Sequence, residues 1–170
     1  MILYHGSNIE IEEIDLTRCR PFKDFEKGFY TTTLKEQAWT MAKRTTRIYE
    51  EGTPYITEFF FDDTILKDAR FKIKRFNEPD IEWARFVINN RNSSFRDIAS
   101  IECNVDGKYD IVTGPVANDD ITALMNVYLA GILSVEALTK ELTFRELSEQ
   151  VSFHSESAVA CLQKTGVHRG

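Results

Sequence analysis

Two short segments near the start of the chain carry residues that could bind a flat, amide-bearing aromatic cation. The first is an apolar stretch that ends in His5, Gly6 and Ser7, and the second is a turn at Gly28 that leads into Tyr30. A glycine lets the backbone approach and hydrogen-bond an amide, and a histidine can bond a sugar hydroxyl. A tyrosine ring can stack on the face of a cationic ring. The two segments therefore predict a binding site for such a group.

The same segments, Leu3–Ser7 and Asp24–Thr32, resemble the NAD-binding signature of the ADP-ribosyltransferase superfamily. The resemblance is closest to the diphtheria-toxin and poly(ADP-ribose) polymerase branch, in which a His-Gly-Ser strand is followed by a Gly-Lys-Gly-aromatic-Tyr strand. This chain keeps every element except the first of those glycines, where it has Glu26. The resemblance implies an NAD-dependent ADP-ribosyltransferase, an enzyme of the glycosyltransferase class that uses NAD as co-substrate and no metal.

The resemblance also implies roles for individual residues. His5 would hold the 2′-hydroxyl of the nicotinamide ribose, while the N–H and C=O of Gly6 would grip the carboxamide. Ser7 lies at the same turn and offers a hydroxyl, and Tyr30, which follows Gly28, would stack on the nicotinamide. The alternatives are structural: His5 could bond its own backbone, and Tyr30 could be a core aromatic of an alternating strand.

In that branch a second aromatic residue sandwiches the nicotinamide from the helix that follows the tyrosine strand. At the equivalent spacing this chain has Met41, and Trp39 lies nearby on the same helix as the better aromatic candidate. The alternative for Trp39 is a helix-face tryptophan that packs against the sheet. The sequence leaves both interpretations open.

Relatives with full activity have a glutamate at the start of a late strand, where it bonds the ribose hydroxyls and stabilises a cation-like transition state. Aligning that strand and the next helix puts Gln150 at this position, beside Glu149. A glutamine can bond the ribose but offers no negative charge, which favours mono-ADP-ribosyl transfer over poly(ADP-ribose) synthesis. Strand alternation allows only one of the two residues to face the cleft. A catalytically weak module that binds NAD or ADP-ribose, and an NAD glycohydrolase, are the alternative functions.

The loop before the tyrosine strand carries Arg18, Arg20 and Lys23. We expect Arg20 or Arg18 to contact the NAD pyrophosphate, because arginine forks suit phosphate oxygens. These bases either remain a solvated surface or form one positive patch with the bases of the following helix, Lys43, Arg44 and Arg47. The macromolecular acceptor is left open between a protein and a nucleic acid.

Two further motifs extend the resemblance over nearly the whole chain. Together with Tyr109–Ala117 and Gln150–His154, the segments above resemble an uncharacterised family of short bacterial proteins allied to this superfamily. By analogy, stand-alone transferase-like domains of this size often act as toxins of toxin–antitoxin or phage-defence systems. The analogy implies a bacterial toxin, with an antitoxin protein as a partner.

The composition is that of a folded globule, with 42% hydrophobic and 12% aromatic residues in a chain of 170. A net charge of -6 disfavours nonspecific binding to DNA or RNA. Three widely spaced cysteines without a C-x-x-C pair support neither a disulfide framework nor a zinc site. We expect a soluble, cytoplasmic protein without membrane contact, because no leader is visible and no apolar run reaches the roughly 20 residues of a membrane span.

No repeat or linker divides the sequence, which predicts one α+β domain over residues 1–170. We expect strands at residues 1–4, 29–32, 55–61, 108–113 and 147–153. We expect helices at residues 33–49, 80–90, 119–130, 135–142 and 156–164, the first with a capping box of Thr33 and Glu36. The resemblance implies two small packed sheets with the NAD cleft between them. His154 and His168 are interpreted as surface residues.

Overall fold

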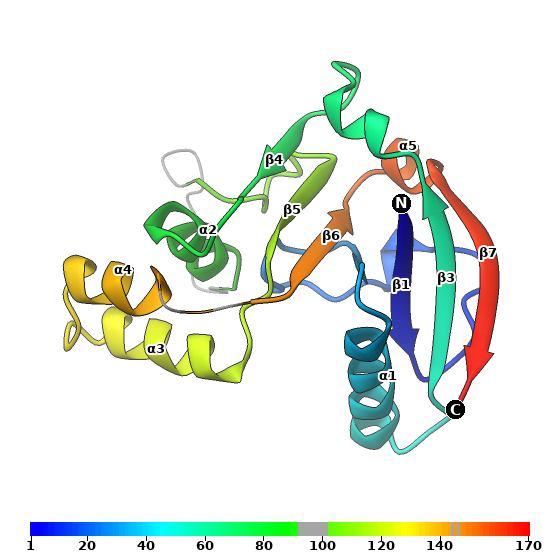
Figure 1. The fold of residues 1–170 in the computed structure, drawn as a ribbon, viewed down its shortest axis with the longest axis horizontal. Coiled ribbons are helices and arrows are strands. Elements are labelled where there is room, and N and C mark those ends of the chain that lie inside the picture. Colours follow the sequence, from blue (N-terminus) through cyan, green and yellow to red (C-terminus); the bar gives the residue numbers. More distant parts are fainter. Residues whose placement is uncertain (92–101, 144, 146) are drawn as a thin grey trace.

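Seven strands and five α-helices lie along residues 1–91, 102–143, 145 and 147–170, the parts of the chain that the computed structural model describes (Figure 1). The strands are β1 (Ile2–Ser7), β2 (Phe29–Thr32), β3 (Tyr55–Phe61), β4 (Ile73–Arg75), β5 (Ile111–Pro115), β6 (Glu149–Phe153) and β7 (Leu162–Arg169). The α-helices are α1 (Lys35–Tyr49), α2 (Ile81–Arg91), α3 (Asp119–Leu129), α4 (Val135–Thr143) and α5 (Glu156–Val159). Over these residues, none of the helices combines the length and the apolar character that a bilayer crossing requires.

The strands form a sheet in the order β4-β5-β6-β2-β1-β3-β7. Neighbouring strands are antiparallel except β4 and β5, which are parallel. The expected α+β class is confirmed, but the strands join in one sheet and not in two packed sheets. The physical reason is a bridge between β1 and β2, where Tyr4 pairs with Thr32 and connects the two halves.

The bridge between β1 and β2 is narrow. While β1 pairs with β3 along its whole length, its register with β2 in the described residues consists of Tyr4↔Thr32. Met1 exchanges both of its backbone hydrogen bonds with Phe61 at the end of β3. Because hydrogen-bonded and non-hydrogen-bonded pairs alternate along an antiparallel ladder, the even-numbered residues of β1 direct their N–H and C=O groups away from β3. Gly6 therefore presents both groups toward the β2 side.

The two faces of the sheet pack against separate cores. Figure 1 shows α2, α3 and α4 gathered near the β4–β5 end, and the core on that side contains Phe25, Phe76, Trp83, Phe86, Val87, Val112, Ile121, Met125, Leu138 and Leu142. Helix α2 buries Trp83, Phe86 and Val87 in this core. The second core contains Leu3, Phe29, Phe59, Phe61, Ile111, Val151 and Phe153. Side chains that alternate along each strand supply both cores.

Helix α1 packs on β1 at Gly6. An added Cβ at this glycine would lie 1.9 Å from the carbonyl oxygen of Ala38, well inside van der Waals contact. Ala38 and Ala42 are the buried residues of α1. Small residues on both sides thus let the helix backbone approach the strand closely.

The sequence predicts several elements well. The bounds of β2 and β3 agree with the predicted strands, and α3 and α4 agree with the predicted helices to within one residue at each end. The predicted capping box of Thr33 and Glu36 is wrong, because α1 begins at Lys35 after Leu34, which has no side-chain cap. The reason is local: the hydroxyl of Thr32 accepts the Leu34 N–H at 3.1 Å.

The helix predicted over residues 156–164 is also wrong. It ends after one turn as α5, and Leu162–Arg169 instead forms β7, which pairs with β3 from Phe61↔Leu162 to Tyr55↔Arg169. Gly166 lies within this strand opposite Glu58. Pairing with the outer edge of β3 overrides the helical pattern of the segment. Strand β4 has no counterpart among the predicted strands, and β5 begins at Ile111 and not at residue 108.

The close contact of α1 with β1 leads to a stability prediction. Gly6→Ala should lower the free energy of unfolding by about 2–3 kcal/mol, because the new methyl group must push the helix away from the strand. The control is Gly166→Ala in β7, where the nearest atom would be 3.7 Å away, an ordinary contact. Urea unfolding of both variants measures the difference. Equal midpoints for the two variants would contradict the packing described for Gly6.

Candidate functional site

The His5 side chain is held between β1 and β2. Its Nδ1 lies 2.7 Å from the carbonyl oxygen of Tyr30, and its ring stacks on Phe29 with the centroids 4.3 Å apart. A carbonyl oxygen can only accept, so Nδ1 carries the proton. Burial lowers the pKa of His5 and keeps the imidazole neutral at neutral pH. Nε2 is then a bare acceptor, and no hydrogen bond joins it to the described residues.

The backbone of Gly6 lies opposite Tyr30. Two residues beyond the pair Tyr4↔Thr32, an ordinary ladder would bond the N–H and C=O of Gly6 to Tyr30. The Tyr30 carbonyl bonds His5 instead, and the register between β1 and β2 does not extend to this pair in the described part of the chain. The N–H and C=O of Gly6 therefore point toward β2 at a position where the two strands are not in register.

Tyr30 is anchored by its hydroxyl. The hydroxyl donates to the carbonyl of Glu26 at 2.6 Å and accepts the N–H of Phe25 at 2.9 Å. Burial raises the pKa of Tyr30 well above its usual value, so the phenol stays protonated. The ring packs against the core around Phe25 and meets His154 edge-on. Because the hydroxyl is occupied, the ring is the part of Tyr30 that remains for contact with a ligand.

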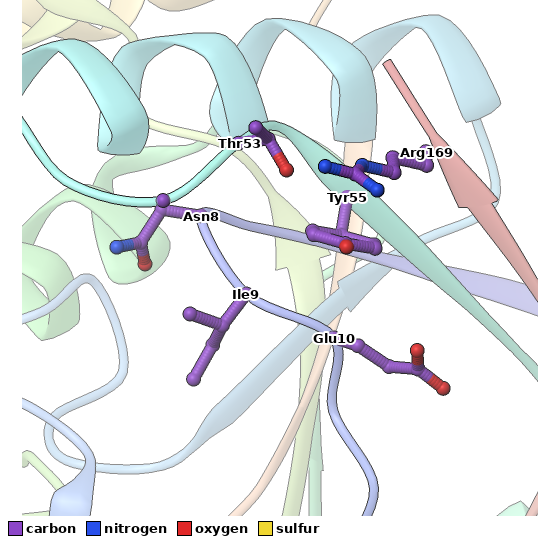
Figure 2. A pocket seen from close by; sticks show the side chains of 7 residues that line it. Asn8, Ile9, Glu10, Thr53, Tyr55 and Arg169 are labelled. Atoms are coloured by element: carbon purple, nitrogen blue, oxygen red, sulfur yellow. The ribbon is translucent and has the colours of Figure 1, made fainter.

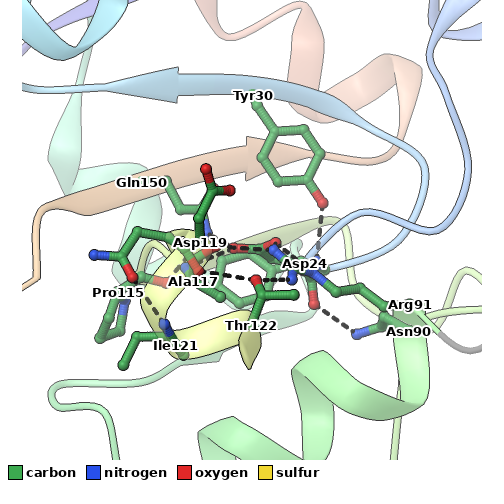
Figure 3. Close-up of polar contacts among 12 residues, drawn as sticks. Asp24, Tyr30, Asn90, Arg91, Pro115, Ala117, Asp119, Ile121, Thr122 and Gln150 are labelled. Atoms are coloured by element: carbon green, nitrogen blue, oxygen red, sulfur yellow. Dashed lines mark hydrogen bonds and ion pairs between the residues drawn. The ribbon is translucent and has the colours of Figure 1, made fainter. Parts of the chain in front are cut away.

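Gln150 and Glu149 are consecutive residues of β6, so their side chains point to opposite faces of the sheet. Gln150 is buried on the face that also carries Tyr30, whereas the Glu149 side chain is exposed. The amide nitrogen of Gln150 donates to the carboxylate of Asp24 at 2.8 Å and to the carbonyl of Pro115 at 3.1 Å (Figure 3). Both partners are acceptors, so they fix which end of the amide is nitrogen. Oε1 is left without a hydrogen bond from the described residues, as an acceptor for a ligand.

The buried carboxylate of Asp24 connects four segments of the chain (Figure 3). One oxygen accepts Nε and Nη2 of Arg91, at the end of α2. The other oxygen accepts the N–H of Ala117 at 2.9 Å and the amide of Gln150. Arg91 also donates to the Ala117 carbonyl and the Thr122 hydroxyl, which ties in α3. No sequence motif indicates this cluster, since Asp24 and Arg91 are 67 positions apart and no spacing links them.

Glu26 stands where the resembled signature has a glycine. Its φ of 73° lies in the left-handed region, which explains why a glycine suits this position. The backbone turns here so that the Glu26 carbonyl can receive the Tyr30 hydroxyl. The Glu26 side chain lies near the Phe22 N–H, at 3.4 Å. The substitution thus keeps the turn at the cost of a strained backbone.

Gly28 and Ser7 have contacts of their own. An added Cβ at Gly28 would lie 2.5 Å from Nδ1 of His154, so the glycine leaves room for that ring. His154 is not the surface residue predicted: it contacts the Lys27 carbonyl and the Ser152 hydroxyl at 2.8 Å each, and burial lowers its pKa to about 4. The Ser7 hydroxyl is occupied by the backbone of Ile9.

Met41 lies on the face of α1 that is directed toward β2 and α3. Gln37, one turn before it, accepts the Thr32 hydroxyl of β2, and Arg44, one turn after it, lies 3.7 Å from Asp119 of α3. Trp39 lies elsewhere, against the C-terminal Gly170. Between the two candidates, the structure brings Met41 toward this side and leaves Trp39 at the end of β7.

The bases of the loop before β2 lie close to those of α1. The Arg20 guanidinium lies 4.6 Å from the centroid of the Tyr49 ring, at the end of the helix. Burial and the neighbouring charges of Arg20, Arg91 and Arg44 lower the pKa of Lys23. Arg20, Lys23 and Arg44 therefore form a positive cluster beside the buried Asp24.

Two open pockets lie at the surface, and one of them borders His154. One, of about 390 Å³, is lined by Asn8, Ile9, Glu10, Gly52, Thr53, Tyr55 and Arg169 (Figure 2). The other, of about 200 Å³, is lined by Leu16, Thr17, Lys27 and His154. Neither includes His5, Tyr30 or Gln150. Within the described ranges, no three His, Cys, Asp or Glu side chains gather as a metal site would require.

The amide orientation of Gln150 predicts the effect of Gln150→Glu. The variant places a second carboxylate between two acceptors and should lose about 2–4 kcal/mol of unfolding free energy at neutral pH. Burial and Asp24 raise the pKa of the new carboxyl, so the variant's stability falls as the pH rises through that pKa. Urea unfolding at about pH 5 and about pH 8 measures this dependence.

Glu149→Gln, at the exposed neighbour, is the matched control and should change stability by less than about 0.5 kcal/mol. A Gln150→Glu variant that is as stable as the wild type at both pH values would contradict the amide orientation. A stable carboxylate at position 150 therefore requires a second change, Asp24→Asn, which removes the competing charge.

The comparisons with known proteins give the chain a family. A family model described as "Protein of unknown function (DUF3990)" matches residues 1–164. No curated protein and no solved structure matches the chain. The match spans nearly all of the sequence, including the segments of His5, Tyr30, Asp24 and Gln150. The protein therefore belongs to the DUF3990 family.

Proposed function

We propose that this protein is an NAD-dependent mono-ADP-ribosyltransferase. The observation that carries the proposal is the interrupted pairing between β1 and β2. His5 takes the carbonyl of Tyr30, and Gly6 on the adjoining strand lies outside the register of β1 with β2. A nicotinamide carboxamide has the complementary pair, an acceptor oxygen and a donor nitrogen. It would add to the edge of β1 as a short piece of strand does.

Three side chains would bind the rest of the nicotinamide riboside. The neutral His5 accepts a ribose hydroxyl at Nε2, because Nδ1 donates to Tyr30. The Tyr30 ring stacks on the pyridinium, which adds a cation–π attraction of about 0.5–2 kcal/mol. Gln150 accepts a second ribose hydroxyl at Oε1, near the carbon that is attacked. Arg20 and Lys23 supply positive charge for the diphosphate.

In the reaction, the bond between C1′ of the ribose and the ring nitrogen of nicotinamide breaks. Its electron pair neutralises the pyridinium, and neutral nicotinamide leaves. An acceptor nucleophile forms the new bond to C1′ and loses its proton to solvent. The protein orients the riboside and stabilises the cation-like ribose through the partial negative charge of Gln150 Oε1. No covalent intermediate with the protein is formed.

One observation favours a second candidate, a module that binds NAD or ADP-ribose without turnover. Gln150 is neutral, and the nearby carboxylate of Asp24 is already bonded by Arg91, Ala117 and Gln150. A site without a free carboxylate stabilises a developing cation less well. Such a module would bind NAD and release no nicotinamide. If water is the acceptor, the products are instead nicotinamide and free ADP-ribose.

The test is incubation of the folded protein with NAD labelled in the adenylate phosphate, in the presence of a cell lysate. We expect nicotinamide release together with label on macromolecules, separated into protein, RNA and DNA. In His5→Asn, the amide nitrogen can still reach the Tyr30 carbonyl but nothing replaces Nε2. This variant should lower the rate of nicotinamide release about 10- to 100-fold.

The matched control is His168→Asn on β7, where the histidine lies near Glu58 and Lys35. This control should keep the wild-type rate. Binding of NAD without nicotinamide release would favour the binding module. Absence of both binding and release from folded protein would contradict the proposed function, and equal rates for the two histidine variants would contradict the role of His5.

A further inference from the structure

We propose that Asp24 is a positioning residue that sets which end of the Gln150 amide faces the substrate. This inference rests on the proposed function, since it concerns how Gln150 meets the ribose. Asp24 is 7% exposed and lies on the loop before β2, whereas Gln150 lies on β6. The two side chains meet at 2.8 Å through a bond that neither the family match nor the resemblance assigns a role (Figure 3).

Among the described residues, the partners of the Asp24 carboxylate are all N–H donors. Arg91 approaches one carboxylate oxygen with two N–H groups, and the Ala117 N–H and the Gln150 amide approach the other. A guanidinium and a backbone N–H cannot accept a hydrogen bond. Only a carboxylate offers an acceptor on both sides at once. The chemistry of the pocket thus selects an aspartate over the equally sized asparagine.

The amide of Gln150 is fixed in return. Its nitrogen donates to Asp24 and to the carbonyl of Pro115, so both of its hydrogens are used. A 180° rotation of the amide would set Oε1 against two acceptors, which is unfavourable. The carboxylate therefore keeps the nitrogen inward and the oxygen available to the ligand.

The direction of the amide decides the sign of the charge that the substrate meets. With Oε1 toward the ribose, a partial negative charge faces the developing cation. With the amide reversed, two N–H groups face it, and the interaction becomes repulsive. Orientation therefore affects the transition state more than the ground state, and its loss should appear in kcat.

The variant Asp24→Asn should reverse the direction of the Gln150 amide. Arg91 carries a charge and attracts the remaining oxygen of the asparagine most strongly. The asparagine nitrogen then faces Ala117 and Gln150, and the Gln150 amide turns to present Oε1 to it. The predicted result is a reversed amide, with a donor toward the substrate.

The competing explanation is that Asp24 has a purely structural role. A variant of Arg91 distinguishes this role from the positioning role. Arg91 contacts the oxygen that Gln150 does not use. Arg91→Lys weakens the ion pair by replacing a two-point contact with a single one, but it leaves the acceptor for Gln150 in place. It is the matched control for a loss of stability without a change in amide direction.

The experiment measures kcat and KM of nicotinamide release for the wild type, Asp24→Asn and Arg91→Lys, with urea unfolding of each. In parallel, the side-chain amide signals of Gln150 are observed by ¹⁵N NMR. We expect kcat of Asp24→Asn to fall about tenfold or more below that of Arg91→Lys, with KM within about threefold of the wild type. The Gln150 amide signals should shift and exchange faster in Asp24→Asn and stay unchanged in Arg91→Lys.

If Asp24→Asn does not fold, Gln150→Met removes the amide at similar volume and should cause the same loss of kcat. Unchanged kcat in Gln150→Met would overturn the inference. So would equal losses in Asp24→Asn and Arg91→Lys, or unchanged Gln150 signals in Asp24→Asn. A wild type that releases no nicotinamide overturns the proposed function and the inference with it. An active wild type with unchanged amide signals overturns the inference alone.

Discussion

The hydrogen bond from His5 to the carbonyl of Tyr30 controls how β1 and β2 meet. A side chain here takes the place that a backbone N–H would fill in a continuous ladder. Pairing is therefore restricted to Tyr4↔Thr32, and the two halves of the sheet are joined at a narrow point. The energetic cost of the missing ladder bond is small, because His5 satisfies the Tyr30 carbonyl. The consequence is that Gly6 and Tyr30 lie outside the register of β1 with β2.

The surroundings of this junction are held by buried polar contacts. Asp24 and Arg91 have side chains that are 10% and 28% exposed, and removing one partner of such a pair costs about 3–5 kcal/mol. The Tyr30 hydroxyl fixes the same loop two residues further on. The loop before β2 is thus attached both to the helices of the first core and to β6. Gln150 gains its direction from that attachment.

The sequence predicts the local elements better than it predicts their assembly. Strands β2 and β3 consist of aromatic and β-branched residues between turn signals, so their bounds are readable from the sequence. The segment of β7 has a helical pattern, and only its partner β3 makes it a strand. Alternation along β6 means that only one of Glu149 and Gln150 can face the candidate site. The orientation of the strand in the fold is needed to identify that residue as Gln150.

The long-range contacts of the candidate site lie beyond single-sequence reasoning. The bonds of Asp24 to Arg91 and Gln150 join residues 67 and 126 positions apart, and no motif spans such separations. The position of Trp39 against Gly170 depends on strand β7, which the sequence pattern does not predict. By contrast, His5, Gly6 and Tyr30 lie in short segments that the sequence already singles out. The His5 side chain reaches the Tyr30 carbonyl because β1 and β2 are neighbours.

The most direct test of the central claim is a titration of the ¹⁵N-labelled protein with NAD, followed by NMR. We expect saturable shifts of the Gly6 amide and of His5 Nε2, whereas Gly166 in β7 and the residues around Arg169 stay unchanged. A carboxamide on the edge of β1 would produce this pattern, because it bonds the Gly6 N–H directly. Saturable shifts confined to the pocket of Asn8, Tyr55 and Arg169, or no shifts at saturating NAD, would contradict the account.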